Sequence, residues 1–176
     1  MKKTISIIAV ITAFLAFSSP IHSQDNIVKL YPAGLMYNSG DGTGANYMFK
    51  WGYERVFTDK ISAEFDMGIV IQSVKVDFGF GSTRATNTIF FPIDVHANYY
   101  ILDDAPQGLY AGAYYFLGFG SVFMAGGAHI GYQHFFVDDQ LALDARLGFG
   151  GGGWVSGCDG CGGFNMPFEV GAGWRF

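Results

Sequence analysis

The sequence predicts an all-β protein, an eight-stranded antiparallel up-and-down transmembrane β-barrel. Three observations lead to this prediction. The chain ends on an alternating strand that stops at an aromatic residue, it begins with an export signal, and eight alternating segments lie between the signal and the end. A strand of a transmembrane barrel needs one apolar face toward lipid and one polar or glycine-rich face toward the lumen.

The C-terminal segment gives the strongest of these signals. Alternate residues form one apolar face, made of Phe168, Val170, Ala172, Trp174 and Phe176. The other face carries Glu169, Arg175 and two glycines. Because chain ends usually fray, a water-soluble protein rarely finishes on such a strand. This ending resembles the C-terminal signal by which Gram-negative outer-membrane barrels are recognised for insertion, which implies that role for the five apolar residues.

The N-terminal segment reads as a secretory signal peptide. Lys2 and Lys3 precede an apolar run from Ile5 to Phe17, and small residues up to Ser23 allow cleavage there. The apolar run is shorter than the roughly 20 residues of a membrane helix, and no cysteine near it suggests a lipid anchor. The predicted organisation is therefore a signal peptide over 1–23 and a barrel over 24–176.

Composition excludes some classes of partner. Loss of the leader removes two of the ten basic residues and none of the fifteen acidic ones, which leaves a net charge of −7. This balance argues against nucleic acid, whose phosphates need a basic stripe. Aromatic residues make up 18% of the chain, as girdles at the two membrane interfaces would require. The uncharged stretch 108–128 is rich in glycine and begins by alternating, so it favours strands over a membrane helix.

The eight alternating segments are 27–37, 45–57, 61–78, 88–102, 108–117, 125–137, 141–150 and 165–176. Three connections, 58–60, 103–107 and 138–140, are short and polar. They alternate with longer ones at 38–44, 79–87, 118–124 and 155–164. In outer-membrane barrels the short turns are periplasmic, so both termini are expected in the periplasm.

Charged residues recur at alternate positions within these segments. Those predicted to project into the lumen are Lys29, Lys50, Glu54, Glu64, Asp66, Asp94, His96, Asp144, Arg146, Glu169 and Arg175. The same alternation fits a soluble barrel with an apolar interior, but the two chain ends favour the membrane. Predicted girdle residues near strand ends are Trp51, Tyr53, Phe57, Tyr99 and Trp174.

We interpret the inward charges as a structural plug of ion pairs, because an eight-stranded barrel is just wide enough for side chains to fill. Since the last strand closes against the first, Glu169 is expected near Lys29, with Arg146 also within reach. The alternative is a narrow ion or proton path through water-filled gaps left by glycines at 52, 68, 112, 148, 171 and 173.

His96 shares a strand face with Asp94 and Asn98, a grouping that could be catalytic or bind metal. No nucleophile stands beside it, so we expect a lumen histidine hydrogen-bonded to a carboxylate. His129 is expected inside and His134 outside. No catalytic residue, cofactor or metal site is assigned.

Cys158 and Cys161 lie in the last long connection. An exported chain meets an oxidising compartment, so a disulfide is expected. Metal binding with Asp159, or two free thiols, are the alternatives.

The whole chain after the signal resembles small eight-stranded outer-membrane barrels of the OmpX type and the OmpA membrane domain. Val28-Lys29-Leu30, Gly34-Leu35 and Tyr53-Glu54-Arg55 look like barrels from Bacteroidetes-type bacteria. The resemblance implies a Gram-negative outer membrane, contact with its lipid and lipopolysaccharide, and help from the barrel-insertion machinery.

This resemblance implies architecture and location more than activity. The expected role is structural or a surface interaction. A porin-like conduit for small solutes is the alternative, and a lipid A acyl-modifying enzyme is a weaker one. Such an enzyme needs a serine and a histidine in reach of the outer leaflet, and no histidine is both outward-facing and near the extracellular rim. A monomer is expected, because a closed barrel has no edge strand.

Overall fold

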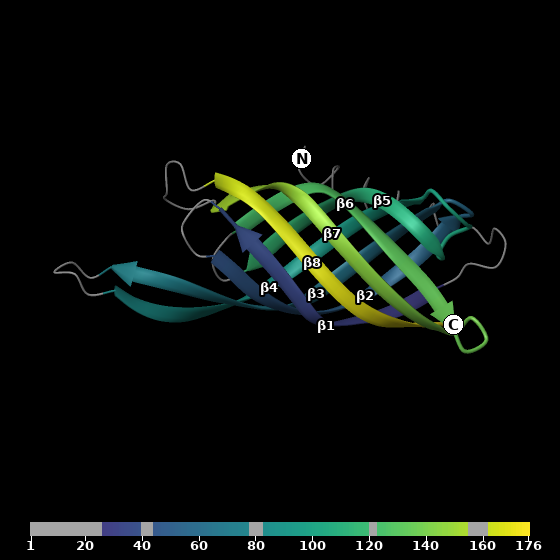
Figure 1. The fold of residues 1–176 in the computed structure, drawn as a ribbon, viewed down its shortest axis with the longest axis horizontal. Coiled ribbons are helices and arrows are strands. Elements are labelled where there is room, and N and C mark those ends of the chain that lie inside the picture. The colour runs from purple at the N-terminus through teal and green to yellow at the C-terminus, as the bar shows by residue number, and fades with distance from the viewer. Residues whose placement is uncertain (1–25, 40–43, 78–82, 120–122, 155–161) are drawn as a thin grey trace, which may run out of the picture.

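The computed structural model describes residues 26–39, 44–77, 83–119, 123–154 and 162–176 as one closed antiparallel barrel (Figure 1). Its strands are β1 (Asn26–Asn38), β2 (Gly44–Thr58), β3 (Ile61–Asp77), β4 (Thr83–Tyr100), β5 (Gly108–Phe119), β6 (Phe123–Phe136), β7 (Leu141–Trp154) and β8 (Gly162–Arg175). Each strand pairs with its neighbours in sequence, and β8 pairs with β1. The predicted fold class and strand number are confirmed. Within the described segments, no helix has the length and apolarity to cross a membrane.

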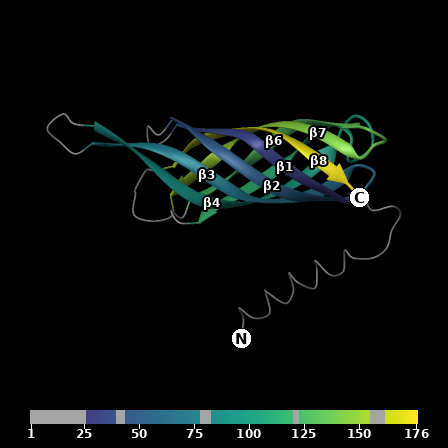
Figure 2. The same cartoon turned by 90° about the horizontal axis from the view of Figure 1, so that it is seen from below.

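The strand β4 begins earlier than the sequence pattern predicted, whereas β3 ends at Asp77, within the predicted range 61–78. β4 begins at Thr83 rather than at residue 88, and residues 83–87 pair with residues 73–77 of β3. Residues 83–87 are mostly polar, as is typical of a loop. Main-chain hydrogen bonds between strands, however, do not depend on the polarity of the side chains. The end of β3 and the start of β4 therefore project beyond the other strands (Figures 1 and 2).

Two other connections are also shorter than predicted. β5 reaches Phe119 and β6 starts at Phe123, so the third long connection shrinks to residues 120–122. β7 continues through a run of glycines to Trp154, and β8 begins at Gly162. Glycine clusters favour turns in a sequence reading, but here Gly150 to Gly153 pair across to β6 and β8.

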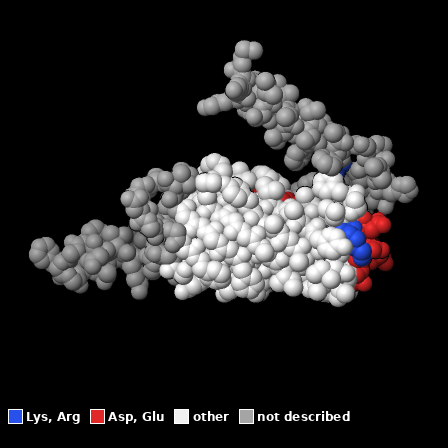
Figure 3. Space-filling model, turned by 90° about the horizontal axis from the view of Figure 1, so that it is seen from above, with Lys and Arg blue, Asp and Glu red and all other residues white. Residues whose placement is uncertain are grey.

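The barrel has an apolar exterior. Phe65, Ile71, Val95 and Ile130 are each more than 40% exposed, on the faces that alternate with buried polar residues. The view in Figure 3 shows a wall nearly free of charge, with charged residues gathered at one end. That end carries the exposed aspartates of the three short turns: Asp59, Asp103, Asp104, Asp138 and Asp139.

The aromatic residues predicted for a girdle lie on this exterior. Trp51, Tyr53, Tyr99 and Trp174 are 39% to 55% exposed, and Phe57 is half-buried. The apolar face of the C-terminal strand also points outward, with Ala172 half-buried and its four larger residues exposed.

A bulge interrupts β1 between Tyr31 and Gly34. The register shifts there against both β2 and β8. Pro32 and Ala33 are both exposed, whereas Tyr31 and Gly34 are both buried. A bulge adds one residue to one strand of a pair, so the inward positions change from odd to even numbers beyond this point.

Candidate functional site

The interior of the barrel holds the charged residues that the sequence analysis singled out. Ten of the eleven are at most 5% exposed: Lys29, Lys50, Glu54, Glu64, Asp66, Asp94, His96, Asp144, Arg146 and Glu169. The eleventh, Arg175, is half-buried at the end of β8, and its guanidinium lies 5.4 Å from the centre of the Phe135 ring.

A first group of ion pairs surrounds Lys29 of β1. The Lys29 Nζ lies 2.8 Å from Glu54 Oε2, 2.9 Å from Glu64 Oε2 and 2.9 Å from Asp144 Oδ2. These carboxylates come from β2, β3 and β7, so the contacts cross the lumen. We call these four residues the Lys29 cluster.

Hydroxyl groups satisfy much of the remaining hydrogen-bonding capacity of the Lys29 cluster. The Tyr31 hydroxyl lies 2.8 Å from Glu64 and 2.7 Å from Asp144, and it can donate its proton to one of them at a time. Tyr110 donates to Asp144 at 2.7 Å. Tyr100, at 2.9 Å, and Ser62 both donate to Glu54.

The sequence analysis missed Tyr31 and Tyr110 as lumen residues, because it looked for charge. Tyr31 follows Lys29 by two positions, and side chains two residues apart on a strand point to the same face. The inward direction of the Tyr31 side chain could therefore have been predicted from the sequence.

A second group surrounds Lys50 of β2. The Lys50 Nζ lies 2.5 Å from Asp94 Oδ2 and 3.7 Å from Asp66 Oδ2, and it also pairs with Glu169. We call these four residues the Lys50 cluster. It takes its three carboxylates from β4, β3 and β8.

Arg146 of β7 joins the two clusters. It pairs with Glu64 of the Lys29 cluster at 2.8 Å, and with Asp66 and Glu169 of the Lys50 cluster. The structure confirms the expectation that Glu169 lies near Arg146. The expectation that Glu169 pairs with Lys29 is wrong, because Glu169 pairs with Lys50 instead. Register explains the difference, because Glu169 lies opposite Gly34, beyond the β1 bulge, while Gly173 lies opposite Lys29.

The network carries more negative than positive charge. The buried charged residues of the described segments comprise six acidic and three basic side chains, an excess of three negative charges with both histidines neutral. Glu54 faces Glu64 directly across β2 and β3, and Asp66 faces Asp94 across β3 and β4. Like charges directly opposite each other destabilise a sheet, and a lysine bridges each of these pairs.

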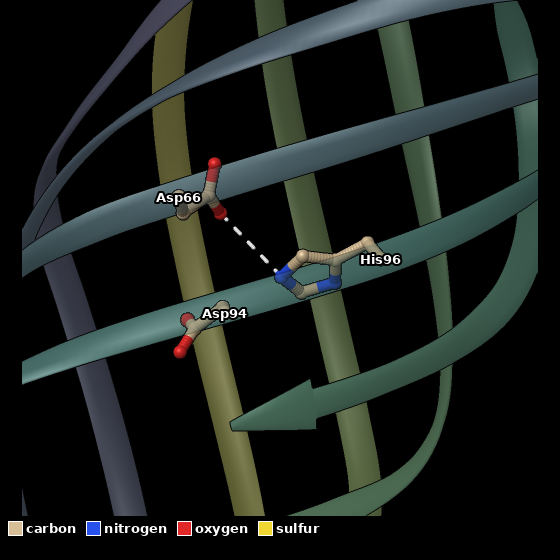
Figure 4. A group of neighbouring side chains, drawn as sticks. All are labelled: Asp66, Asp94 and His96. Atoms are coloured by element: carbon tan, nitrogen blue, oxygen red, sulfur yellow. Dashed lines mark ion pairs between the residues drawn. The ribbon is translucent and has the colours of Figure 1, made fainter. Parts of the chain in front are cut away.

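His96 of β4 lies beside the second acidic pair (Figure 4). Its Nε2 is 3.4 Å from Asp66 Oδ2, but neither ring nitrogen has a hydrogen-bond partner among the described residues. Asn98, grouped with His96 by the sequence pattern, instead contacts His129 Nε2 at 2.8 Å. The neighbours of His96 come from the adjacent strand because cross-strand residues approach more closely than residues two apart on one strand.

The histidine orientations follow the sequence prediction. His129 of β6 is buried beside His96, with 5.2 Å between ring centres. His134 is half-buried and stacks on exposed Tyr132.

Little free space remains around the network. A cavity of about 20 Å³ lies among Asp94, His96, His129 and other side chains, enough for one water molecule. Of the glycines expected to leave gaps, Gly148 lines this small cavity. Side chains from neighbouring strands cover others, as the Tyr31 ring covers Gly171.

Two predicted features lie outside the described residues. These are the signal peptide over 1–23 and the pair Cys158 and Cys161, so the disulfide remains a prediction.

Comparison with known proteins defines a class for this fold, that of small eight-stranded outer-membrane barrels. No protein-family model matches the chain, and no curated protein sequence does so at a significant level. Several solved structures share the fold, among them Ail, OprG and AlkL.

Ail, the attachment invasion locus protein of Yersinia pestis, is 13% identical with a TM-score of 0.51, over 89% of this chain and 100% of that one. The outer membrane protein OprG of Pseudomonas aeruginosa is 11% identical with a TM-score of 0.53, and the match covers 87% of this chain and 95% of OprG. The outer membrane protein AlkL, whose structure was determined in lipid bilayers, is 14% identical with a TM-score of 0.55, and the match covers 90% of this chain and 93% of AlkL.

Proposed function

We propose that this protein is an integral barrel of a Gram-negative outer membrane whose sealed lumen has a structural role, and that it acts through its surface. The observation that carries the proposal is the charge network, in which Arg146 of β7 pairs with Glu64 of β3 on the opposite side of the barrel, while Lys29 and Lys50 each pair with carboxylates of several other strands. A lumen filled by buried ion pairs leaves no passage for solutes larger than water, so function is left to the exterior and the rims.

The exterior supports a membrane location. An apolar wall with aromatic residues toward the strand ends is what lipid requires. Three barrels that share the fold are outer-membrane proteins or, for Ail, an attachment invasion locus protein by name. In our proposal the end with the short acidic turns faces the periplasm together with both termini, and lipid and lipopolysaccharide surround the wall. A barrel closed by β1 and β8 presents no free edge, which supports a monomer.

The projecting part of β3 and β4 supports a surface role. These strands have 17 and 18 residues, whereas the other six have 12 to 15. They extend beyond the barrel at the end opposite the short turns (Figure 2). In the proposed orientation this hairpin stands above the outer leaflet, where it can meet a surface partner.

Fractionation tests the location, and a bilayer recording tests the seal. The protein should co-purify with the outer membrane and migrate differently on gels before and after boiling; recovery as a soluble periplasmic species would refute the location. In planar bilayers the wild type should show no steady conductance. Tyr114→Ala, which removes a ring beside the small cavity, serves as the matched opened variant. Steady wild-type currents would favour the conduit instead.

A complementation experiment separates an envelope role from a surface role. A strain lacking the protein receives either the wild type or a variant in which a tight turn replaces residues 74–86. If the barrel alone stabilises the envelope, both restore detergent resistance. If the hairpin carries the function, the shortened variant inserts normally but fails to restore the phenotype.

An enzyme is the weakest alternative. Ser62, a buried serine of the described lumen, bonds to Glu54 and Asn98 rather than to a histidine. An altered lipid A mass spectrum in cells that produce the protein would overturn our proposal that it is not an enzyme.

A further inference from the structure

We propose that the lumen binds one divalent transition-metal ion, such as Zn²⁺, between Asp66, Asp94 and His96. The three side chains are all at least 95% buried and come from the neighbouring strands β3 and β4. One ligand atom from each lies within 4.8 Å of the others. Figure 4 shows one Asp66 oxygen facing the imidazole nitrogen of His96, joined to it by a dashed line, with Asp94 nearby on β4.

The spacing suits a small cation. The 3.4 Å between His96 Nε2 and Asp66 Oδ2 is close to the separation of two ligands on one tetrahedral zinc, about 3.4 Å for bonds of 2.0–2.1 Å. Asp94 would supply the third protein ligand, with one carboxylate oxygen within 4.8 Å of the ligand atoms of the other two residues. The cavity of about 20 Å³ beside Asp94 and His96 has room for a water molecule as the fourth.

Each of the three side chains has a buried polar atom without a hydrogen-bond partner among the described residues, although the Asp66 oxygen that lies 3.4 Å from His96 also pairs with Arg146. Lys50 and Arg146 occupy the Oδ2 atoms of Asp94 and Asp66. The Oδ1 atoms of both aspartates and both ring nitrogens of His96 are buried without a hydrogen-bond partner in the described part of the chain. Buried polar atoms are normally satisfied, so three adjacent side chains with free donor atoms point to a missing ligand.

Charge also favours a cation at this place. The described lumen has an excess of three negative charges. In the Lys29 cluster, tyrosine and serine hydroxyls donate to the carboxylates. The Lys50 cluster instead has the facing pair Asp66 and Asp94 with unsatisfied oxygens. A divalent ion there would remove the repulsion across β3 and β4 and reduce the excess charge to one.

The donor set selects the type of metal. Imidazole nitrogen with carboxylate oxygen suits zinc and its first-row neighbours, whereas Mg²⁺ and Ca²⁺ prefer sites made only of oxygen. A metal that joins two adjacent strands inside a sealed barrel has a structural effect. The metal site therefore rests on the structural part of the proposed function, to which it adds a ligand. A barrel that conducts or acts as an enzyme could contain the same site.

The test uses full-length mature protein in which Cys158→Ser and Cys161→Ser remove the loop thiols as competing ligands. The protein is refolded in detergent with Zn²⁺ or with Ca²⁺, so access to a closed lumen does not limit loading. After passage over a chelating resin, we expect about one zinc per chain and no retained calcium. His96→Gln and Asp94→Asn should each lower retained zinc at least about tenfold.

Two controls separate the site from general lumen charge. Asp144→Asn makes the same charge change in the Lys29 cluster, and His134→Gln removes an exterior histidine; both should retain zinc. X-ray absorption of the zinc-loaded wild-type lumen should show imidazole scattering with nitrogen and oxygen ligands, a result that needs no lumen variant to fold. Failure of the wild-type lumen to retain zinc, equal retention by His96→Gln, or a spectrum without imidazole would each overturn the proposal. The conductance and fractionation experiments do not test the metal site. A failure of the metal-site proposal can therefore be distinguished from a failure of the sealed-barrel proposal.

Discussion

Arg146 contacts Glu64, Asp66 and Glu169 and so joins both clusters, which makes its replacement the most informative change in the lumen. Arg146→Met keeps much of the volume but removes one of only three buried positive charges among the described residues. The excess of negative charge rises from three to four. Breaking a buried ion pair by removing one partner costs about 3–5 kcal/mol, and here three carboxylates lose a partner.

Glu169→Gln is the matched comparison. It breaks contacts in the same network but lowers the negative excess from three to two. Lys50 still has Asp94, and Arg146 still has Glu64 and Asp66. We expect a cost of about 1.5–3 kcal/mol, the range of a hydrogen bond to a charged group, which is smaller than the cost of Arg146→Met.

Reversible urea unfolding in lipid vesicles measures the difference. For a denaturant slope of about 2 kcal/mol per molar, a loss of about 4 kcal/mol lowers the midpoint by about 2 M. Arg146→Met should therefore unfold at clearly lower urea than Glu169→Gln, with unchanged slopes. Equal midpoints would refute the argument from charge imbalance, and a shift below about 0.5 M for Arg146→Met would mean that water screens the network.

Three further predictions concern the wall, the last connection and the end of the chain. Ile93→Arg on the outward face of β4 should cost about 2–4 kcal/mol in the same vesicle assay, whereas Ile93→Val should be nearly neutral; a harmless arginine would mean that this face does not meet lipid. Thiol labelling of the unreduced protein should find no free cysteine, and labelling of both Cys158 and Cys161 would contradict the predicted disulfide. Deletion of Phe176 should reduce the heat-modifiable fraction in the outer membrane, while Lys60→Ala in a short turn should leave it unchanged.

The sequence was sufficient to assign faces, because side-chain direction in a strand has a period of two. The alternation of Asp144 and Arg146 with leucines placed both residues on one face, and the two chain ends indicated that this face is the lumen. It was not sufficient to assign partners across the lumen. Those depend on the stagger of eight strands and on the β1 bulge, which moves Glu169 away from Lys29 and toward Lys50.

The early start of β4 was also missed by the sequence analysis, although the length of β3 was predicted. In the proposed orientation residues 83–87 lie outside the membrane and need no lipid-facing side, and they lack an apolar alternation. Main-chain hydrogen bonds pair this part of β4 with β3, and such bonds cannot be predicted from the residue composition.

The ion pairs of the Lys29 cluster have a consequence for the order of folding. Lys29, Glu64 and Asp144 lie on strands 1, 3 and 7, so they can meet only when the sheet has curled into a closed ring. A partly inserted sheet would turn these charges toward acyl chains, which makes stepwise entry of single strands costly. The network should therefore form as the barrel inserts, with part of its contacts already present in the transition state. Variants of Arg146 should then slow folding as well as accelerate unfolding.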